Sequence, residues 1–155
     1  MPAPEISTCL WFDDQAEAAA TFYCSLFDNA RITEVMRRQG DPKGGAFTVA
    51  FSLMGQNFWG LNGGPHYKLS PAASITVYVD TQAEVDRLWS ALLENGGLES
   101  RCGWLTDRFG LSWQLIPRAL IRLLKADTSG QVIQAMMGMI KIDIAALEAA
   151  MPGNP

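Results

Sequence analysis

The sequence is short of histidine, cysteine and charge, and each shortage excludes a kind of protein. His66 is the single histidine among 155 residues, so one chain cannot build a metal site from several imidazoles. Cys9, Cys24 and Cys102 are odd in number and lack Cys-x-x-Cys spacing, which favours free thiols in a reducing cytoplasm over a disulfide framework. The first residues have neither the basic nor the apolar region of a signal peptide, so we expect a cytoplasmic protein.

Charge is scarce and slightly negative in balance. Asp, Glu, Lys and Arg make up 18% of the chain, compared with about 25% in an average domain, and the net charge is −4. Basic residues do not cluster beyond pairs such as Arg37-Arg38, so the positive face that a nucleic-acid partner requires is missing. No apolar run approaches the roughly 18 residues of a membrane-spanning helix. We therefore expect neither a nucleic-acid nor a membrane partner.

Apolar and aromatic residues are plentiful by contrast. Hydrophobic residues account for 48% of the chain and include five Trp, which indicates a folded domain with a large core or an aromatic pocket. The chain also repeats itself at an offset of 67, because the segment DDQAE at 13–17 matches DTQAE at 80–84. An apolar segment of strand length, 6–12 or 74–79, precedes each copy. The repeat therefore predicts two copies of a strand that runs into a helix.

Each predicted helix has a start signal, and each is followed by more strands. Thr81 and Glu84 form a T-x-x-E capping box, and Asp14 with Glu17 is its Asp-capped counterpart in the first copy. Alternation of apolar and polar residues predicts the next strands, at 31–38, 46–54 and 57–61 in the first copy and at 98–103 and 111–116 in the second. Between the last two, Asp107-Arg108 is interpreted as a turn with a surface ion pair.

The first copy has the order β-α-β-β-β, and the repeat predicts the same order for the second copy, where two strands after the helix are identified. Helical periodicity follows at 118–126, 131–140 and 143–151. We predict an α+β fold in a single domain, residues 1–155. Module one covers about 5–63 and module two about 73–117, with a helical extension at about 118–151. Modules of this size are too small to stand alone, so we expect them to share a core.

Several local motifs resemble one known family. They are Trp11-Phe12-Asp13, Gln15-Ala16-Glu17-Ala18-Ala19, Leu61-Asn62-Gly63-Gly64-Pro65-His66, Cys102-Gly103-Trp104-Leu105, Ser112-Trp113-Gln114 and Asp143-Ile144-Ala145-Ala146-Leu147-Glu148. This string is similar to the PhnB-like family, labelled 3-demethylubiquinone-9 3-methyltransferase-like, of the vicinal oxygen chelate (glyoxalase/bleomycin resistance) superfamily. The resemblance implies paired βαβββ modules that form a cup-shaped mixed sheet. It also implies pairing of modules within or between chains, and a homodimer is our hypothesis.

The residues can be tested against the methyltransferase label. A methyltransferase of the usual kind holds S-adenosylmethionine on a Gly-rich loop between a parallel strand and a helix. Gly63-Gly64 follows a predicted strand, but the sequence predicts a turn after it and not a helix. A chain of βαβββ units also has no doubly wound sheet for that cofactor. We therefore expect no cofactor.

Metal-binding members of the superfamily, as the resemblance implies, take His, Glu or Gln ligands from the first and last strand of each module. Here the first strand offers only Cys9, and the equivalent strand at 74–79 offers none. In the last strand the ligand follows a glycine by four positions, in a Gly-x-x-apolar-ligand pattern. Counted from Gly55 and Gly110, this pattern places Trp59 and Gln114 where the ligands would be. One neutral amide binds a divalent ion far too weakly, so we predict no metal.

Seven residues form the predicted ligand site, and most have two interpretations. His66 is a candidate general base or a loop residue bonded to a carbonyl. Cys102, expected at a strand end, is more readily a small buried hydrophobe than a nucleophile. Gln114 either faces the cup or is a satisfied buried amide. The tryptophans are either core or ligand platform. The full set is Trp11, Trp59, Asn62, His66, Cys102, Trp104 and Gln114.

Three functions stay open at this point. The first is a metal-independent protein that binds a small molecule in an aromatic cup. The second is a lyase, isomerase or transferase with His66 as general base. The third is a resistance-type protein that sequesters its ligand. In each case Met136, Met137, Met139 and Ile140 form an apolar helix face, which we expect at a homodimer seam.

Overall fold

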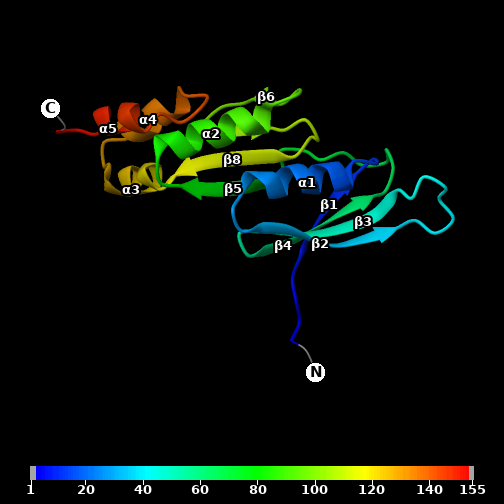
Figure 1. Cartoon of the computed structure of the whole chain (residues 1–155). Helices are drawn as coiled ribbons and strands as arrows, with labels where there is room; N and C mark the ends of the chain where they lie inside the picture. Colours follow the sequence, from blue (N-terminus) through cyan, green and yellow to red (C-terminus); the bar gives the residue numbers. More distant parts are fainter. Residues whose placement is uncertain (1–2, 154–155) are drawn as a thin grey trace. The chain divides into compact units, whose positions relative to one another are not determined.

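The computed structural model describes residues 3–153, which fall into two compact units with their boundary after Leu69. We call them the N-terminal unit and the C-terminal unit. Each contains a βαβββ module with a four-stranded mixed sheet (Figure 1). The predicted α+β fold of two such modules, followed by helices, is therefore confirmed. That all 155 residues make one domain stays a prediction.

The N-terminal unit packs one helix on one face of its sheet. The strand order is β1-β4-β3-β2, with β1 parallel to β4 and the other neighbours antiparallel. Helix α1 presents Ala19, Ala20 and Tyr23 to the sheet, and small alanines let helix and sheet approach closely. The elements are β1 (Thr8–Phe12), α1 (Ala16–Leu26), β2 (Ala30–Arg37), β3 (Ala46–Leu53) and β4 (Gln56–Asn62).

The C-terminal unit repeats this topology with order β5-β8-β7-β6, in which β5 and β8 are parallel. Helix α2 buries Val85, Leu88, Trp89 and Leu92 along one stripe, as its amphipathic spacing predicts. Its capping box between Thr81 and Glu84 is confirmed. The elements are β5 (Ser74–Val79), α2 (Gln82–Leu93), β6 (Leu98–Glu99), β7 (Trp104–Thr106) and β8 (Ser112–Pro117).

The helices after β8 pack into the C-terminal unit. A cluster of apolar side chains joins them to the end of β8, and Asp143 caps the last helix by accepting a hydrogen bond from the backbone N–H of Ala146. The cluster consists of Ile116, Leu120, Leu123, Val132, Ile142 and Leu147. The helices are α3 (Arg118–Ala126), α4 (Gln131–Met137) and α5 (Ile144–Ala149). Met136 and Met139, predicted on an exposed apolar face, pack against this cluster, whereas Met137 is exposed.

Two local predictions are wrong. The residue before α1 is Gln15, and no side chain caps the helix from a neighbouring position, so Asp14 and Glu17 do not form a second capping box. Glu17 instead forms an exposed ion pair with Arg37. The strand predicted at 98–103 ends at Glu99, and the chain then turns with Cys102 at a φ of +58°.

Candidate functional site

Each sheet has one face against its module's helix and one face away from it, which we call the α1-distal and α2-distal faces. On β1 and β4 the register pairs Cys9 with Trp59 and Trp11 with Leu61. Side chains alternate along a strand, so Trp59 lies on the opposite face from the buried Phe58. The two predicted tryptophans of the N-terminal unit, Trp11 and Trp59, therefore share the α1-distal face.

A cleft of about 580 Å³ lies over the α1-distal face. The half-buried Trp59 lines it, next to Ala50 on the neighbouring strand. Glu5 borders the cleft and accepts a hydrogen bond from Asn57 Nδ2 at 2.6 Å. The remaining lining residues are Ser7, Thr33, Glu34, Thr48, Phe51 and Phe58. The cleft thus combines an indole with hydroxyl, amide and carboxylate groups.

The α2-distal face carries the predicted residues of the C-terminal unit. Gln114 is paired with Thr76 on one side and with Trp104 on the other, so Trp104 and Gln114 lie side by side. Gln114 Nε2 donates to Ser74 Oγ at 2.9 Å, and both side chains are half-buried. Ser74 therefore orients the Gln114 amide on the α2-distal face.

The two faces correspond position by position. Cys9 lies opposite Trp59, and Thr76 lies opposite Gln114. These are the positions from which metal-binding relatives would take their ligands, and only Cys9 and Gln114 offer a donor there. Burial raises the pKa of the Cys9 thiol, which disfavours the thiolate that binds metals. Within residues 3–153, no three His, Cys, Asp or Glu side chains gather closely enough to hold a metal ion.

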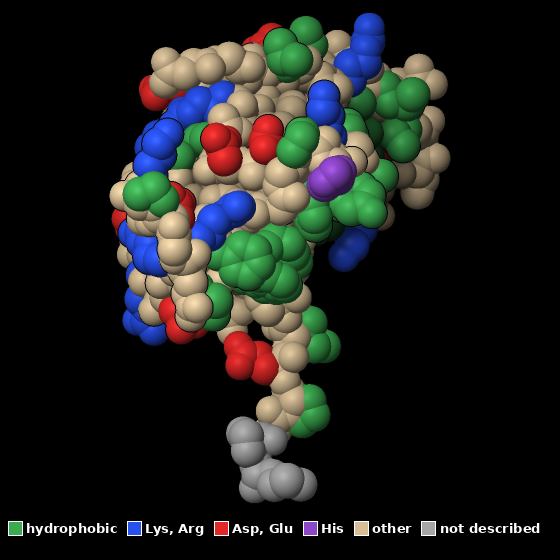
Figure 2. Space-filling model, turned by 90° about the vertical axis from the view of Figure 1, so that its right-hand side faces the viewer, with side chains coloured by type: hydrophobic (Ala, Val, Ile, Leu, Met, Phe, Trp, Pro, Cys, Tyr) green, Lys and Arg blue, Asp and Glu red, His purple; other side chains and the backbone are tan. Residues whose placement is uncertain are grey.

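Trp11 fixes the loop that follows β4. Its Nε1 donates to the carbonyl oxygen of Gly64 at 2.9 Å, and its ring meets Tyr67 edge-on at 4.9 Å. The ring also covers Gly63 so closely that any Cβ there would overlap it. His66 lies in the same loop and is exposed; it is the purple side chain of Figure 2. The structure therefore brings Trp11 and His66 to one loop, with Trp11 as its anchor.

Asn62 lies on the other face of β4, where it is 4% exposed. Its Oδ1 accepts from the backbone N–H of Ala16 at 2.9 Å, and its Nδ2 donates to the carbonyl of Ala46 at 3.0 Å. The side chain joins the start of α1 to the start of β3. Because it points away from the α1-distal face, the structure does not bring Asn62 and Trp59 together.

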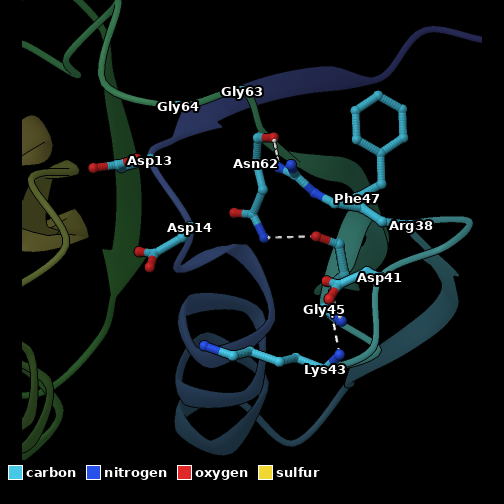
Figure 3. Close-up of a pocket in the computed structure, with 11 residues that line it drawn as sticks. Asp13, Asp14, Arg38, Asp41, Lys43, Gly45, Phe47, Asn62, Gly63 and Gly64 are labelled. Carbon is cyan, nitrogen blue, oxygen red and sulfur yellow. Dashed lines mark hydrogen bonds between the residues drawn. The ribbon is translucent and has the colours of Figure 1, made fainter.

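Asn62 borders a separate pocket of about 600 Å³ near the start of α1 (Figure 3). Arg38 closes one side by donating from its guanidinium to the Asn62 carbonyl at 2.6 Å. Asp41 and Lys43 come from the β2–β3 loop, and Asp13 and Asp14 from the end of β1. Cations and carboxylates are mixed here, so the pocket has no dominant charge.

Two residues of the C-terminal unit differ from their prediction. Cys102 lies in a turn, and its backbone N–H donates to the carbonyl of Met139 at 2.9 Å. Asp107, expected at the surface, is 3% exposed. It accepts hydrogen bonds from the backbone N–H groups of Phe109 and Leu111 and from Trp113 Nε1, at 2.8, 3.1 and 2.8 Å. The Asp-x-x-Gly turn signal and the nearby Trp are the sequence features that indicate such a buried acceptor.

Several solved structures have a fold similar to that of this chain. The PhnB protein from Bacillus cereus is 31% identical, with a TM-score of 0.67, over 74% of this chain and 99% of that one. A protein from Pseudomonas aeruginosa is 21% identical, with a TM-score of 0.62, over 74% and 98%. The fosfomycin resistance protein FosX from Listeria monocytogenes is 14% identical, with a TM-score of 0.52, over 76% and 94%. No curated protein matches the chain.

The paired βαβββ modules thus have the fold of the glyoxalase/bleomycin resistance protein from Albidiferax ferrireducens and of FosX. Residues 4–116 also match the family described as 3-demethylubiquinone-9 3-methyltransferase. The chain belongs to this PhnB-like family.

The described residues do not fit the methyl donor that the family description implies. After Gly63 and Gly64 the chain runs through turns to β5, so no helix begins at this glycine pair. The ring of Trp11 occupies the space beside Gly63 that a cofactor would need. Each sheet is a four-stranded mixed sheet rather than a doubly wound parallel one.

No helix found in residues 3–153 has the length and apolar character to span a membrane.

Proposed function

We propose that the chain is a metal-independent, cytoplasmic protein that binds a small molecule on the α1-distal face of its N-terminal unit. The observation that carries this proposal is the cleft of about 580 Å³ that Trp59 lines. Its size is in the usual range of small-molecule sites, and it combines an aromatic surface with a few polar groups. Trp104 and Gln114 offer an indole and an amide on the corresponding face of the C-terminal unit.

The chemistry of the cleft favours a planar, partly polar ligand. The indole of Trp59 offers an aromatic surface for stacking. Thr48, Glu34 and Asn57 add a hydroxyl, a carboxylate and an amide that can orient the ligand. His66 is proposed as a further polar contact of the N-terminal unit, and Gln114 as a polar contact on the corresponding face of the C-terminal unit.

Metal independence rests on the donor set. Four positions correspond to the ligand positions of metal-binding relatives: Cys9, Trp59, Thr76 and Gln114. Of these, Trp59 cannot bind a divalent ion and Thr76 is a poor ligand. Elemental analysis of the purified protein should find less than about 0.1 divalent metal ion per chain. A stoichiometric metal that dialysis against a chelator removes, with loss of ligand binding, would overturn this part of the proposal.

A ligand screen tests the binding site itself. Planar aromatic and heteroaromatic compounds are screened by thermal shift, and hits are titrated by the quenching of tryptophan fluorescence. Trp59→Leu should abolish the thermal shift. Phe47 is an exposed aromatic residue outside the cleft, so Phe47→Leu should retain the shift. Equal binding by wild type and Trp59→Leu would contradict the proposed site.

His66 distinguishes a binder from an enzyme. If a hit is turned over, its rate is measured with His66→Ala and with the exposed neighbour Lys68→Ala as control. A general base contributes roughly 10²–10⁴-fold in rate. A loss of that size confined to His66→Ala supports the enzyme alternative, and retained turnover rules out this base.

We also propose a homodimer. Ile133, Met137 and Ile140 are exposed apolar side chains on and after α4. Burying such residues stabilises an association between two copies. Sedimentation velocity at micromolar concentration should show a dimer, and Met137→Lys with Ile133→Lys should convert it to a monomer. A wild-type monomer at that concentration would overturn the proposal.

A further inference from the structure

Helix α3 is basic on one side and apolar on the other. Arg118, Arg122 and Lys125 follow one another at spacings of four and three residues, which places them on a single helix face. Leu120 and Leu123, on another side of the helix, are buried in the core. The helix is therefore fixed to the unit by its apolar side, and its cations are held in a row.

This basic row borders a groove of about 520 Å³. The groove is lined by the three cations together with Tyr78 and Ile121. Tyr78 lies near the end of the edge strand β5, and its side chain is 53% exposed. Helix α3 begins where the parallel strand β8 ends, so the groove lies at the C-terminal ends of these two strands (Figure 1). None of its five lining residues is acidic.

The carboxylates that pair with the arginines of the basic row lie outside the groove, and these ion pairs are weak. Arg118 pairs with Asp80 at 3.0 Å, and Arg122 approaches Glu148 at 3.9 Å. All four of these side chains are substantially exposed. Exposed pairs of this kind are worth about 0–1 kcal/mol. A ligand anion can therefore replace these carboxylates at little cost.

We propose that this groove binds a small organic anion with an aromatic or apolar body and a carboxylate or phosphate head. The Tyr78 ring and the Ile121 side chain provide an apolar floor, and the stems of the cationic side chains extend it. Guanidinium groups bind carboxylate and phosphate oxygens through charge-assisted, often bidentate, hydrogen bonds. Lys125 adds a third positive charge at the end of the groove.

A small anion fits these observations better than a nucleic acid or a membrane. Three cations over about two helical turns are too few to follow a phosphate backbone, and the chain as a whole carries a net charge of −4. A polyanion is repelled by that net charge, whereas a single carboxylate mainly senses the local row. The groove has no residue in common with the Trp59 cleft, so this proposal stands or falls independently of the proposed function.

The test uses probes of matched shape in the full chain. Titrations with 2-naphthoate, 2-naphthyl phosphate and the neutral 2-naphthalenemethanol are followed by ¹H–¹⁵N NMR. We expect both anions to shift the amide signals around Tyr78 and Ile121 in a saturable way, and the neutral alcohol to bind at least roughly tenfold more weakly. The stronger of the two anions identifies the preferred head group. Equal binding of the alcohol would overturn the assignment of an anion site.

Variants locate the site. Arg122→Gln combined with Lys125→Gln removes two charges but keeps good helix formers, and should weaken 2-naphthoate by roughly tenfold or more. Arg31→Gln combined with Lys68→Gln removes the same charge from exposed positions elsewhere and should leave the affinity unchanged. Circular dichroism confirms that both variants fold.

Three results would overturn the proposal. The first is an equal loss in both double variants, which would show attraction to net charge alone. The second is a shift pattern confined to the surroundings of Trp59. The third is saturable binding of single-stranded RNA or phosphatidylserine vesicles through Arg122 and Lys125, with no saturable binding of either small anion.

Discussion

The indole ring of Trp11 lies directly against Gly63, fifty-two positions later in the chain, and leaves no room for a Cβ atom there. The same indole donates its N–H to the carbonyl of Gly64. Gly63-Gly64 therefore acts as a surface for an aromatic ring rather than as a phosphate-binding turn. This contact links the first strand of the module to the loop after its last strand.

Gly63→Ala should displace the Trp11 ring and break its hydrogen bond. Overpacking of this kind costs about 1–3 kcal/mol of unfolding free energy. Urea unfolding should show this loss, with a red shift of tryptophan emission as the indole becomes more exposed. In Gly138→Ala the added Cβ meets nothing closer than 3.5 Å, so this control should remain close to wild type. Equal stability of both variants would contradict the packing.

Asn62→Leu should destabilise the N-terminal unit. The change leaves the N–H of Ala16 and the carbonyl of Ala46 without their side-chain partner. Each buried unsatisfied group costs about 1–3 kcal/mol, so we expect a loss of about 2–5 kcal/mol in urea unfolding. Asn57→Leu removes an exposed amide from the same strand and should cost less than about 1 kcal/mol. If Asn62→Leu instead keeps full stability and loses only ligand binding, its role is in recognition.

Asp107→Ala should be among the most damaging changes in the C-terminal unit. It removes the acceptor of three hydrogen bonds, one of them from the fully buried Trp113. We expect a loss of about 3 kcal/mol or more in unfolding free energy. Asp107→Asn keeps one oxygen for the backbone N–H groups and should lose less. A similar small loss in both variants would show that these bonds contribute little.

The start of α4 should be acid-sensitive. The Ser129 hydroxyl, followed by the Val132 backbone N–H, lowers the pKa of Asp127 below its usual value of 3.8. Because the pKa is lower in the folded state, this stabilisation is complete above about pH 4 and is lost as the pH falls through the folded-state pKa. Asp127→Asn should therefore be less stable than wild type at about pH 7, and the gap should close towards about pH 2. Thermal unfolding against pH measures this.

A matched control is Asp28→Asn, which changes an exposed carboxylate in the N-terminal unit. Its stability difference from wild type should vary much less with pH. A gap for Asp127→Asn that stays constant from neutral to acidic pH would contradict the interpretation, because it would show a loss of packing rather than of a charged acceptor.

Local signals in the sequence were sufficient for some elements and not for others. The capping box between Thr81 and Glu84 could be predicted, because both its hydrogen bonds join residues three positions apart, and it is confirmed. The matching prediction for α1 is wrong because Asn62, forty-six positions away, bonds the N–H of Ala16. Local residue patterns carry no information about such a distant partner. The short β6 has the same explanation, since Cys102 bonds to the extension instead of continuing a strand.

The candidate site was predictable to the extent that strand alternation determines it. The glycine spacing predicts Trp59 and Gln114 as equivalent positions of the two last strands, and the register pairs them with Cys9 and Thr76. Alternation also separates Asn62 from Trp59, because three positions along a strand reverse the face. The groove beside α3 was not predicted, since Tyr78 and Arg118 become neighbours only through the parallel pairing of β5 with β8.

The link between the turn at Cys102 and the helical extension is made by main-chain atoms. The N–H groups of Cys102 and Gly103 bind the carbonyls of Met139 and Ile140, at 2.9 and 2.8 Å. Peptide carbonyls are common to all amino acids, so this attachment does not depend on which side chains stand at 139 and 140. Substitutions can therefore change the outer surface of the extension without detaching it from the module.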